Sequence, residues 1–296
     1  MSHKSQLIIF GEVLFDNFPN GEQVLGGAPF NVAWHLQAMG DDPCFISRVG
    51  EDVSGRKIID AMQRWGMETS AIQIDSEHQT GCVDVAMINN EPHYNITQNC
   101  AYDFIGLSEI KKIVEKPFAK HVFYHGTLAM RNSTTKQAYE KLVSDLSLSV
   151  FLDVNLRSPW WEQDNVSIWL RRARWVKLNL EELQQLGSVN GDIQEAMAQF
   201  QSQYELELLI VTRGADGAVI RTREGELYEA SPPAVDNFVD TVGAGDAFTA
   251  VFLHGLISSW PLEKILETAQ WFASTVVGIR GAISKDHEFY KMLNFH

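Results

Sequence analysis

Short apolar runs alternate with amphipathic segments along most of this chain, and that alternation constrains its fold more than any other feature. The pattern is typical of βα units, in which helices cover the faces of a largely parallel sheet. We therefore expect an α/β protein. The predicted strands are Leu7–Phe10, Cys44–Arg48, His121–His125, Phe151–Asn155, Trp175–Leu178 and Leu208–Thr212.

Helical periodicity and suitable cap residues define the segments between those strands. Gly40 ends the first of these helices and Gly66 ends the second. Because no linker rich in proline or serine and no repeat divides the chain, we expect residues 1–296 to form a single domain. The predicted helices are Ala28–Met39, Ser54–Trp65, Ser133–Ser144 and Asp192–Tyr204.

Two stretches break this rhythm and predict a small β-appendage. Val13–Leu25 holds two apolar stretches around Pro19-Asn20-Gly21, whose Asn-Gly pair is a strong hairpin signal. Cys82–Thr97 turns back on itself at Asn89-Asn90-Glu91. A β-lid on an α/β core usually closes over a ligand that needs shielding from water, and an edge hairpin without functional motion is an equal alternative. The predicted lid segments are residues 12–25 and 81–98.

Charge and cysteine usage exclude several classes of protein. Lysine plus arginine number 24 against 38 for aspartate plus glutamate, and the net charge of −14 argues against a nucleic-acid or anionic-membrane binder. Three cysteines without metal-type spacing indicate a reducing, cytoplasmic compartment. The apolar run Leu7–Phe10 is too brief for a signal peptide or a membrane span. We therefore expect a cytoplasmic protein, and an anionic small ligand stays possible because clustered N–H groups hold anions whatever the net charge.

The segment Asp240–Phe248 (DTVGAGDAF) carries the most chemical information. Its small residues let the backbone curl, so that the N–H groups of residues 243–246 converge at the positive end of a helix as an anion hole for a phosphoryl group. A carboxylate there repels phosphate unless it has a task, and accepting the proton of an attacking hydroxyl is the obvious task for Asp246. The plainer alternative is that Asp240 and Asp246 only begin a helix and the glycines only make a turn.

Two familiar nucleotide-binding patterns are not present. Phe248 stands where the dinucleotide pattern G-x-G-x-x-G needs its third glycine, which disfavours a Rossmann oxidoreductase. Gly50–Lys57 has the spacing of a P-loop, but Arg56 and Lys57 stand where that loop needs Lys and Ser or Thr. We therefore reject it as a phosphate loop.

Two motifs together resemble those of a known family. Asp240–Phe248 resembles the C-terminal signature of the PfkB, or ribokinase-like, sugar kinases, and Gly26–Ala33 (GGAPFNVA) resembles their N-terminal signature. Because the two stand in the right order near opposite ends of a chain of the right size, the resemblance covers essentially the whole chain. It implies a ribokinase-like fold, with a three-layer α/β/α core, a mainly parallel sheet and a small β-sheet lid. It also implies an ATP-dependent kinase that phosphorylates a hydroxymethyl group of a monosaccharide.

The resemblance assigns substrate and catalytic roles residue by residue. Gly11-Glu12 with Asp16 matches the place where the family holds a sugar with an aspartate, and a carboxylate or an amide can grip vicinal hydroxyls. Asp153–Arg157 (DVNLR) resembles the D-x-N-x-R run of fructokinases, whose arginine lies near the sugar or the transferred phosphate. A structural ion pair of that arginine with Asp153 or Glu162 is the alternative. The implied substrate residues are Asp16, Gly26, Gly27, Asn31 and Asn155, and the implied catalytic residues are Asp246, Gly243, Ala244, Gly245 and Arg157.

Nucleotide and metal roles rest on the resemblance alone. The run Asn179–Glu182 resembles the family's N-x-x-E element, whose acidic residue places the Mg²⁺ of ATP through water, although charged residues that open a helix are common. Val211–Ala218 resembles a segment that lies along the nucleotide in the family, with a hairpin turn as the alternative. The implied residues are Asn179, Thr212, Arg213, Gly214, Gly217 and Gln270 for the nucleotide, Glu182 for Mg²⁺ and Asp240 for K⁺.

Fructose is the first acceptor that these motifs imply, since they look more like those of fructokinases than those of ribokinases or nucleoside kinases. Ribose, 2-keto-3-deoxygluconate and related ketoses stay open, because a few pocket contacts decide hydroxyl specificity. A non-catalytic sugar- or nucleotide-binding regulator on the same fold is the alternative from another class. The implied partners are the monosaccharide and ATP with Mg²⁺, with K⁺ and a homodimer through the edges of the lid as further expectations.

Overall fold

In a computed structural model of the chain, the structure describes residues 6–88, 91–107, 110, 121–146, 148–187, 192–234 and 238–293. Within this part, a large sheet has the strand order β13-β12-β11-β10-β9-β8-β1-β4-β5. Its strands run parallel from β11 to β5, and β12 and β13 add an antiparallel edge. All six strands predicted from apolar runs are present. The bounds are β1 (Gln6–Phe10), β4 (Cys44–Gly50), β5 (Ile72–Asp75), β8 (His121–His125), β9 (Leu148–Asp153), β10 (Trp175–Asn179), β11 (Leu208–Thr212), β12 (Ala218–Thr222) and β13 (Leu227–Ala230).

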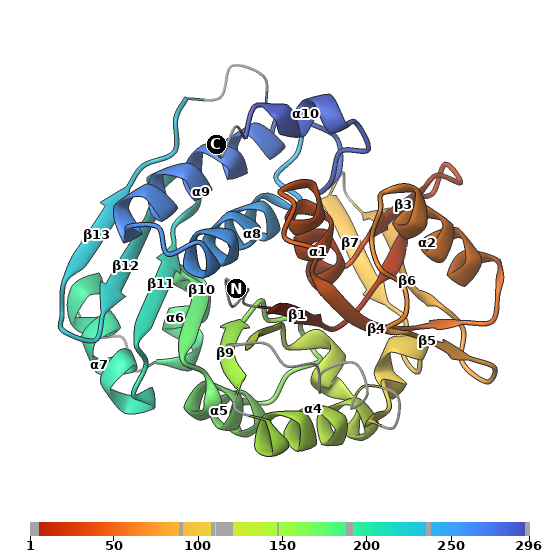
Figure 1. The fold of residues 1–296 in the computed structure, drawn as a ribbon, viewed down its shortest axis with the longest axis horizontal. Helices are drawn as coiled ribbons and strands as arrows, with labels where there is room; N and C mark the ends of the chain where they lie inside the picture. The colour runs from red at the N-terminus through yellow and green to blue at the C-terminus, as the bar shows by residue number, and fades with distance from the viewer. Residues whose placement is uncertain are drawn as a thin grey trace, which may run out of the picture.

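Helices cover both faces of this sheet, which gives three layers (Figure 1). Alternate residues of β1 show the division, because Leu7 and Ile9 pack into one core cluster whereas Ile8 and Phe10 pack into the other. The four predicted helices are present, with bounds within a residue or two of those expected. One face carries α1 (Ala28–Ala38), α2 (Val53–Arg64), α8 (Ala244–Ile257), α9 (Leu262–Val276) and α10 (His287–Lys291), and the other carries α4 (Ser133–Asp145), α5 (Gln163–Arg172), α6 (Leu180–Leu186) and α7 (Ile193–Tyr204).

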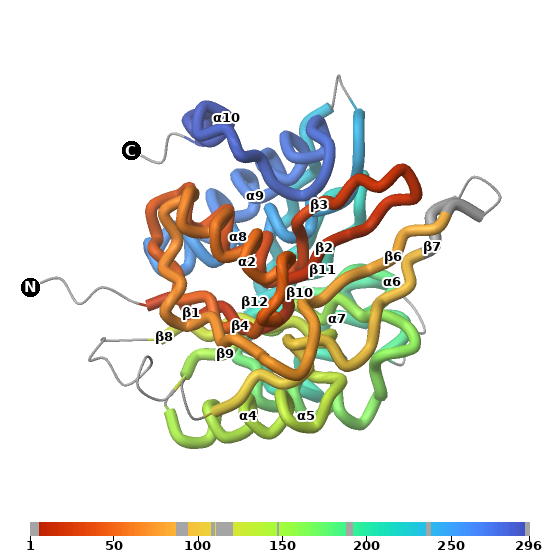
Figure 2. Tube along the Cα trace, turned by 90° about the vertical axis from the view of Figure 1, so that its right-hand side faces the viewer, coloured from red at the N-terminus to blue at the C-terminus, as the bar shows by residue number. Residues whose placement is uncertain are grey.

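A second, small sheet with the order β3-β2-β6-β7 projects from one side of the core (Figure 2). The hairpin predicted at Pro19-Asn20-Gly21 is confirmed, and its turn is closed by a hydrogen bond from Gly21 N to Phe18 O. The second turn was predicted at 89–91, and its Asn89 and Asn90 lie outside the described residues. The bounds are β2 (Leu14–Asn17), β3 (Gln23–Gly26), β6 (Gly81–Ile88) and β7 (Glu91–Ile96).

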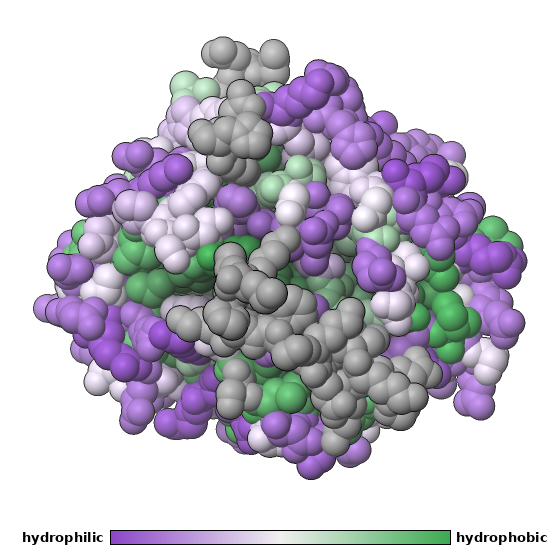
Figure 3. Space-filling view, viewed as in Figure 1, coloured by the Kyte–Doolittle hydropathy of each residue, from purple (hydrophilic) through white to green (hydrophobic). Residues whose placement is uncertain are grey.

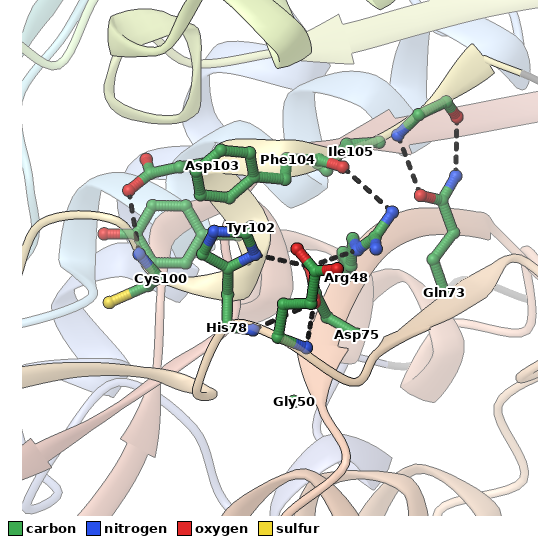
Figure 4. A network of polar contacts seen from close by, with 12 residues as sticks. Arg48, Gly50, Gln73, Asp75, His78, Cys100, Tyr102, Asp103, Phe104 and Ile105 are labelled. Carbon is green, nitrogen blue, oxygen red and sulfur yellow. Dashed lines mark hydrogen bonds and ion pairs between the residues drawn. The ribbon is translucent and has the colours of Figure 1, made fainter.

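A polar network fixes the place where the small sheet leaves the core (Figure 4). Asp75 ends β5, and its Oδ1 accepts the backbone N–H groups of Glu77 and His78. Arg48 of β4 donates to Asp75 Oδ2 at 2.7 Å and to the carbonyl oxygen of Phe104, while the ring of His78 stacks on that of Phe104. The end of β5, which leads into the small sheet, and the segment around Phe104, which follows β7, are thereby both held against β4.

None of the helices in the described ranges is both long and apolar enough to cross a membrane. Hydrophilic residues predominate on the face drawn in Figure 3, and hydrophobic residues appear there in separate patches.

Candidate active site

A cavity of about 440 Å³ opens where the core meets the small sheet. The parallel strands of the core present their carboxyl ends there, which is where ligands bind in open α/β sheets. The small sheet supplies an opposite wall with Leu14, Val83 and Ile96. The other lining residues are Glu12, Asp16, Gly27, Ala28, Asn31, Tyr94, Leu128, Asp153, Asn155, Arg157, Lys177, Thr241, Val242, Gly243, Gly245 and Asp246.

Asp246 stands in the first turn of α8, facing this cavity. Helix α8 begins after Gly243, whose φ of 82° favours glycine and where a Cβ would lie 2.4 Å from Ala282. Asn31 of α1 donates from Nδ2 to Asp246 Oδ2 at 2.8 Å. Burial raises the pKa of Asp246 to about 6, although the bond from Asn31 opposes the shift. This carboxyl group can therefore accept a proton near neutral pH.

The amino end of α8 offers free backbone donors beside Asp246. Within the described residues, the N–H groups of Gly243, Gly245 and Asp246 have no hydrogen-bond acceptor, as is usual for a first helical turn. The N–H of Ala244 differs, because it donates to Thr241 O at 3.3 Å. The turn can thus hold an anion with three amides rather than the four expected from the sequence.

The predicted sugar-side residues come from β2 in the small sheet and from the start of α1, next to the first turn of α8. Asp16, Gly27 and Asn31 all line the cavity. Burial raises the pKa of Asp16 to about 6, and the charge of Arg157 lowers it. Gly27 has a φ of 108°, and a Cβ there would lie 2.8 Å from Glu12 O, so only glycine fits. Gly26 does not line the cavity but lies directly behind the Asp16 carboxylate.

Asn155 and Arg157 follow the carboxyl end of β9 and also line the cavity. Asn155 has a φ of 40°, a left-handed conformation that asparagine tolerates. Three carboxyl groups of the cavity have a pKa that burial raises and that the positive charge of Arg157 partly brings back down, namely Glu12, Asp16 and Asp246. The ion pair with Asp153 that the sequence offered as an alternative does not form, because Asp153 pairs with Lys177.

The sequence analysis missed Lys177, a buried cation in the floor of the cavity. Its Nζ donates to both oxygens of Asp153, at 2.9 and 2.8 Å. The Thr249 hydroxyl of α8 lies 2.9 Å from Asp153 Oδ2 and 2.9 Å from Gly245 O, so its one proton can serve either acceptor, and this contact joins the ion pair to the first turn of the helix. The available signal was a single lysine within the apolar strand 175–178.

The predicted nucleotide residues gather at a neighbouring edge of the sheet, outside the lining of the cavity. Asn179 and Thr212 are register partners at the ends of β10 and β11. Gly217, where a Cβ would lie 2.1 Å from Ala230 O, and Gln270, which donates to that same oxygen, meet at the end of β13. Of the other two, Gly214 is exposed and Arg213 pairs with Glu229.

The two predicted metal residues are engaged locally. Glu182 Oε1 accepts Leu156 N at 2.7 Å, and its Oε2 accepts Asn179 N, while Asn179 caps α6 in return. Asp240 Oδ1 accepts Val242 N. No group of three acidic, histidine or cysteine side chains in the described residues could hold a metal by itself. A metal here would need ligands from a nucleotide or water, which fits the way Mg²⁺ binds with phosphates.

Comparison with known proteins assigns the chain to a class. The sequence matches the pfkB family of carbohydrate kinases over residues 5–288, and the chain belongs to that family. It is a carbohydrate kinase. The chain is 28% identical to a fructokinase of Salmonella typhimurium, over 93% of this chain and 94% of that protein. It is 30% identical to a fructokinase of Klebsiella pneumoniae, over 84% of this chain and 83% of that protein.

Solved structures confirm the ribokinase-like fold. An aminoimidazole riboside kinase of Salmonella enterica, solved with aminoimidazole riboside and an ATP analogue, superposes with a TM-score of 0.84, 24% identity and 98% coverage of each chain. A fructokinase of Vibrio cholerae, solved with fructose, ADP and a calcium ion, superposes with a TM-score of 0.83, 23% identity, and 99% and 100% coverage of this chain and of that one.

Proposed function

We propose that this carbohydrate kinase transfers the γ-phosphoryl group of ATP to a hydroxymethyl group of a monosaccharide, with fructose as the first acceptor. The observation that carries the proposal is Asp246, a carboxylate with a raised pKa beside three free amides of α8. A base and an anion site within one helical turn suit a reaction in which a hydroxyl loses a proton as it attacks phosphorus. The fructokinases among its relatives favour fructose.

In the proposed reaction, the oxygen of the sugar hydroxyl forms a bond to the γ-phosphorus while the bond from that phosphorus to ADP breaks. Asp246 accepts the proton of the hydroxyl. Asn31 holds Oδ2 of Asp246 by its amide, which leaves the other carboxylate oxygen for the substrate. The amides of Gly243 and Gly245 meet the charge that develops on the phosphoryl oxygens. Arg157, exposed at the rim of the cavity, adds a positive charge on the same side.

The acceptor is positioned by residues of the small sheet, of α1 and of the segment after β9, which together form the sugar wall of the cavity. Asp16, Asn31 and Asn155 offer carboxylate and amide groups that suit vicinal hydroxyls, and Gly27 lets the ring approach the backbone. The small sheet acts as a lid whose apolar side chains, among them Val83, exclude water that would otherwise hydrolyse ATP.

Glu182 would help to hold the Mg²⁺ of ATP, through water, because backbone amides already engage both of its carboxylate oxygens. The metal ion would neutralise charge on the nucleotide phosphates. The backbone around Asp240 is our candidate for K⁺. Asn179, Thr212 and Gly217 face the nucleotide.

A coupled ADP-release assay with ATP, Mg²⁺ and K⁺ tests the proposal across fructose, ribose, tagatose, 2-keto-3-deoxygluconate and adenosine. We expect sugar-dependent turnover led by fructose, and loss of turnover when EDTA removes the divalent metal. If another sugar gives the highest turnover, the proposed mechanism stands and that sugar replaces fructose as the acceptor. If no acceptor stimulates ADP release while one raises the melting temperature, the chain is a binding regulator on this fold.

A further inference from the structure

Glu12 occupies a tightly fixed position at the floor of the cavity, and the mechanism above does not use it. It follows β1 directly, after Gly11, where a Cβ would lie 2.5 Å from the ring of Pro29. The carbonyl oxygen of Glu12 is the atom against which Gly27 packs. Both contacts hold the backbone of Gly11 and Glu12 closely against the start of α1.

The side chain of Glu12 is buried but faces the cavity. It is 3% exposed, and its Oε2 has no hydrogen-bond partner among the described residues. Asn31 Oδ1, on the same cavity, is also buried without a donor. A buried acceptor without a donor costs free energy, so two such atoms on one cavity indicate a ligand that brings its own N–H or O–H groups.

Burial and the groups around Glu12 act on its pKa in opposite directions, and the net effect is a raised pKa. Arg157 and Arg131 favour its ionised form, and Asp246 opposes it. The guanidinium of Arg131 forms its ion pair with Asp103 through Nε and Nη2, and its Nη1 is buried without a partner among the described residues. Tyr124, buried behind the cavity, stays protonated because burial raises its pKa well above the usual value. Burial raises the pKa of Glu12 itself to about 7, so both protonation states are populated at neutral pH.

We propose that Glu12 is a specificity-determining residue of the acceptor site, whose free Oε2 accepts a hydrogen bond from a sugar hydroxyl other than the one that is phosphorylated. The proposal rests on the proposed function for the identity of the acceptor class. With Asp16, it places two carboxyl groups on the sugar wall. Acceptors with a carboxylate or phosphate of their own are then repelled, so the site selects neutral polyhydroxyl sugars over sugar acids.

Monodeoxy analogues of the leading neutral sugar test this contact. Every analogue keeps the phosphorylated hydroxymethyl group and lacks one other hydroxyl. In the unmodified enzyme, the analogue that lacks the hydroxyl bound by Glu12 should have a kcat/KM about tenfold to a hundredfold below that of the parent sugar. Without this hydroxyl, the buried carboxylate stays unpaired. In Glu12→Met, that analogue and the parent sugar should react within about threefold of each other, while the discrimination against the other analogues persists.

Proton release gives a second readout that does not depend on catalysis. A hydroxyl that donates to Glu12 favours the carboxylate, so sugar binding without ATP should release up to about half a proton at pH 7. Calorimetry in two buffers of different ionisation enthalpy measures this release. Glu12→Gln should lose that contribution, and the exposed Glu51→Gln serves as the matched control that keeps it.

Three results would overturn the proposal. One is an unmodified enzyme that accepts all the monodeoxy analogues within about threefold. Another is a Glu12→Met variant that slows the parent and every analogue by the same factor, which is the mark of a structural role. The third is unchanged proton release in Glu12→Gln. If no neutral sugar is phosphorylated at all, the proposed function fails instead, and the calorimetry still reports whether Glu12 meets a sugar.

Discussion

Replacing Asp246 by asparagine removes the proposed base and keeps the shape of its side chain. The amide oxygen of asparagine can still accept the bond that Asn31 now donates to Asp246 Oδ2 at 2.8 Å. Sugar binding should therefore change little. A positioned general base contributes about 10² to 10⁴ in rate, so we expect kcat to fall by at least about a hundredfold.

The same substitution should stabilise the protein above pH 6. The pKa of Asp246 is raised from 3.8 to about 6 in the folded state, so the folded protein binds more protons than the unfolded chain between these values. Stability consequently falls as pH rises through that window, and the cost is fully present above it. A shift of this size corresponds to about 3 kcal/mol, and water in the open cavity reduces it to about 1–2 kcal/mol.

The assay compares Asp246→Asn with the unmodified enzyme at pH 7.5, by coupled ADP release and by thermal unfolding. Asp60→Asn on the exposed side of α2 is the matched control, with kcat and melting temperature unchanged. We expect Asp246→Asn to raise the melting temperature by about 2–4 °C while kcat collapses. A kcat within about fivefold of the unmodified enzyme would refute the assignment of the base. A lower melting temperature would refute the argument that burial of the ionised Asp246 lowers the free energy of unfolding.

Three further predictions concern the same site. Gly243→Ala forces a methyl group to within 2.4 Å of Ala282 at a φ of 82°, so urea denaturation should show a loss of about 2 kcal/mol or more, and a neutral substitution would contradict this geometry. Lys177→Met leaves Asp153 as an unpaired buried charge, so the free energy of unfolding should fall by about 3–5 kcal/mol. The double variant with Asp153→Asn should recover part of this loss, and an equal loss in both variants would show that the two charges are not coupled. kcat/KM should rise through pH 6 as Asp246 loses its proton and, because Glu12 ionises near pH 7, should level off only above about pH 7, whereas a midpoint near pH 4 would place the base in open water.

Local patterns were enough to predict most of the fold. The alternation of apolar runs and amphipathic segments predicted the parallel strands and the helices between them, and Asn20-Gly21 predicted the first hairpin of the small sheet. These features depend on neighbours a few residues apart, so the sequence shows them directly. The order of the strands in the sheet depends on long-range pairing, which the periodicity of one segment does not contain.

The site was predictable only where a motif carried it. Gly243 and Asp246 stand in one recognisable segment, and the structure places both on the cavity. Lys177 carries no such local pattern, because its importance comes from burial and from Asp153, a partner far along the chain. Glu12 stands in the Gly11-Glu12 segment that the resemblance connects with Asp16, but only the structure shows that its own side chain is buried at the cavity. The contribution of the Ala244 amide to the anion hole stays a prediction. Its bond to Thr241 O, from residue i to residue i−3, depends on the detailed shape of the turn, which the motif does not specify.

The bond between Asn31 and Asp246 joins residues that are 215 positions apart. During synthesis the amino-terminal part of a chain emerges and begins to fold first. In the described residues, all the strands of both sheets precede α8, so they leave the ribosome before the segment with the proposed base does. Helices α8 and α9 also supply much of the core that packs against α1 and the sheet. The last fifth of the polypeptide therefore brings the proposed base and completes the core in the same step, so the enzyme cannot act before its chain is finished.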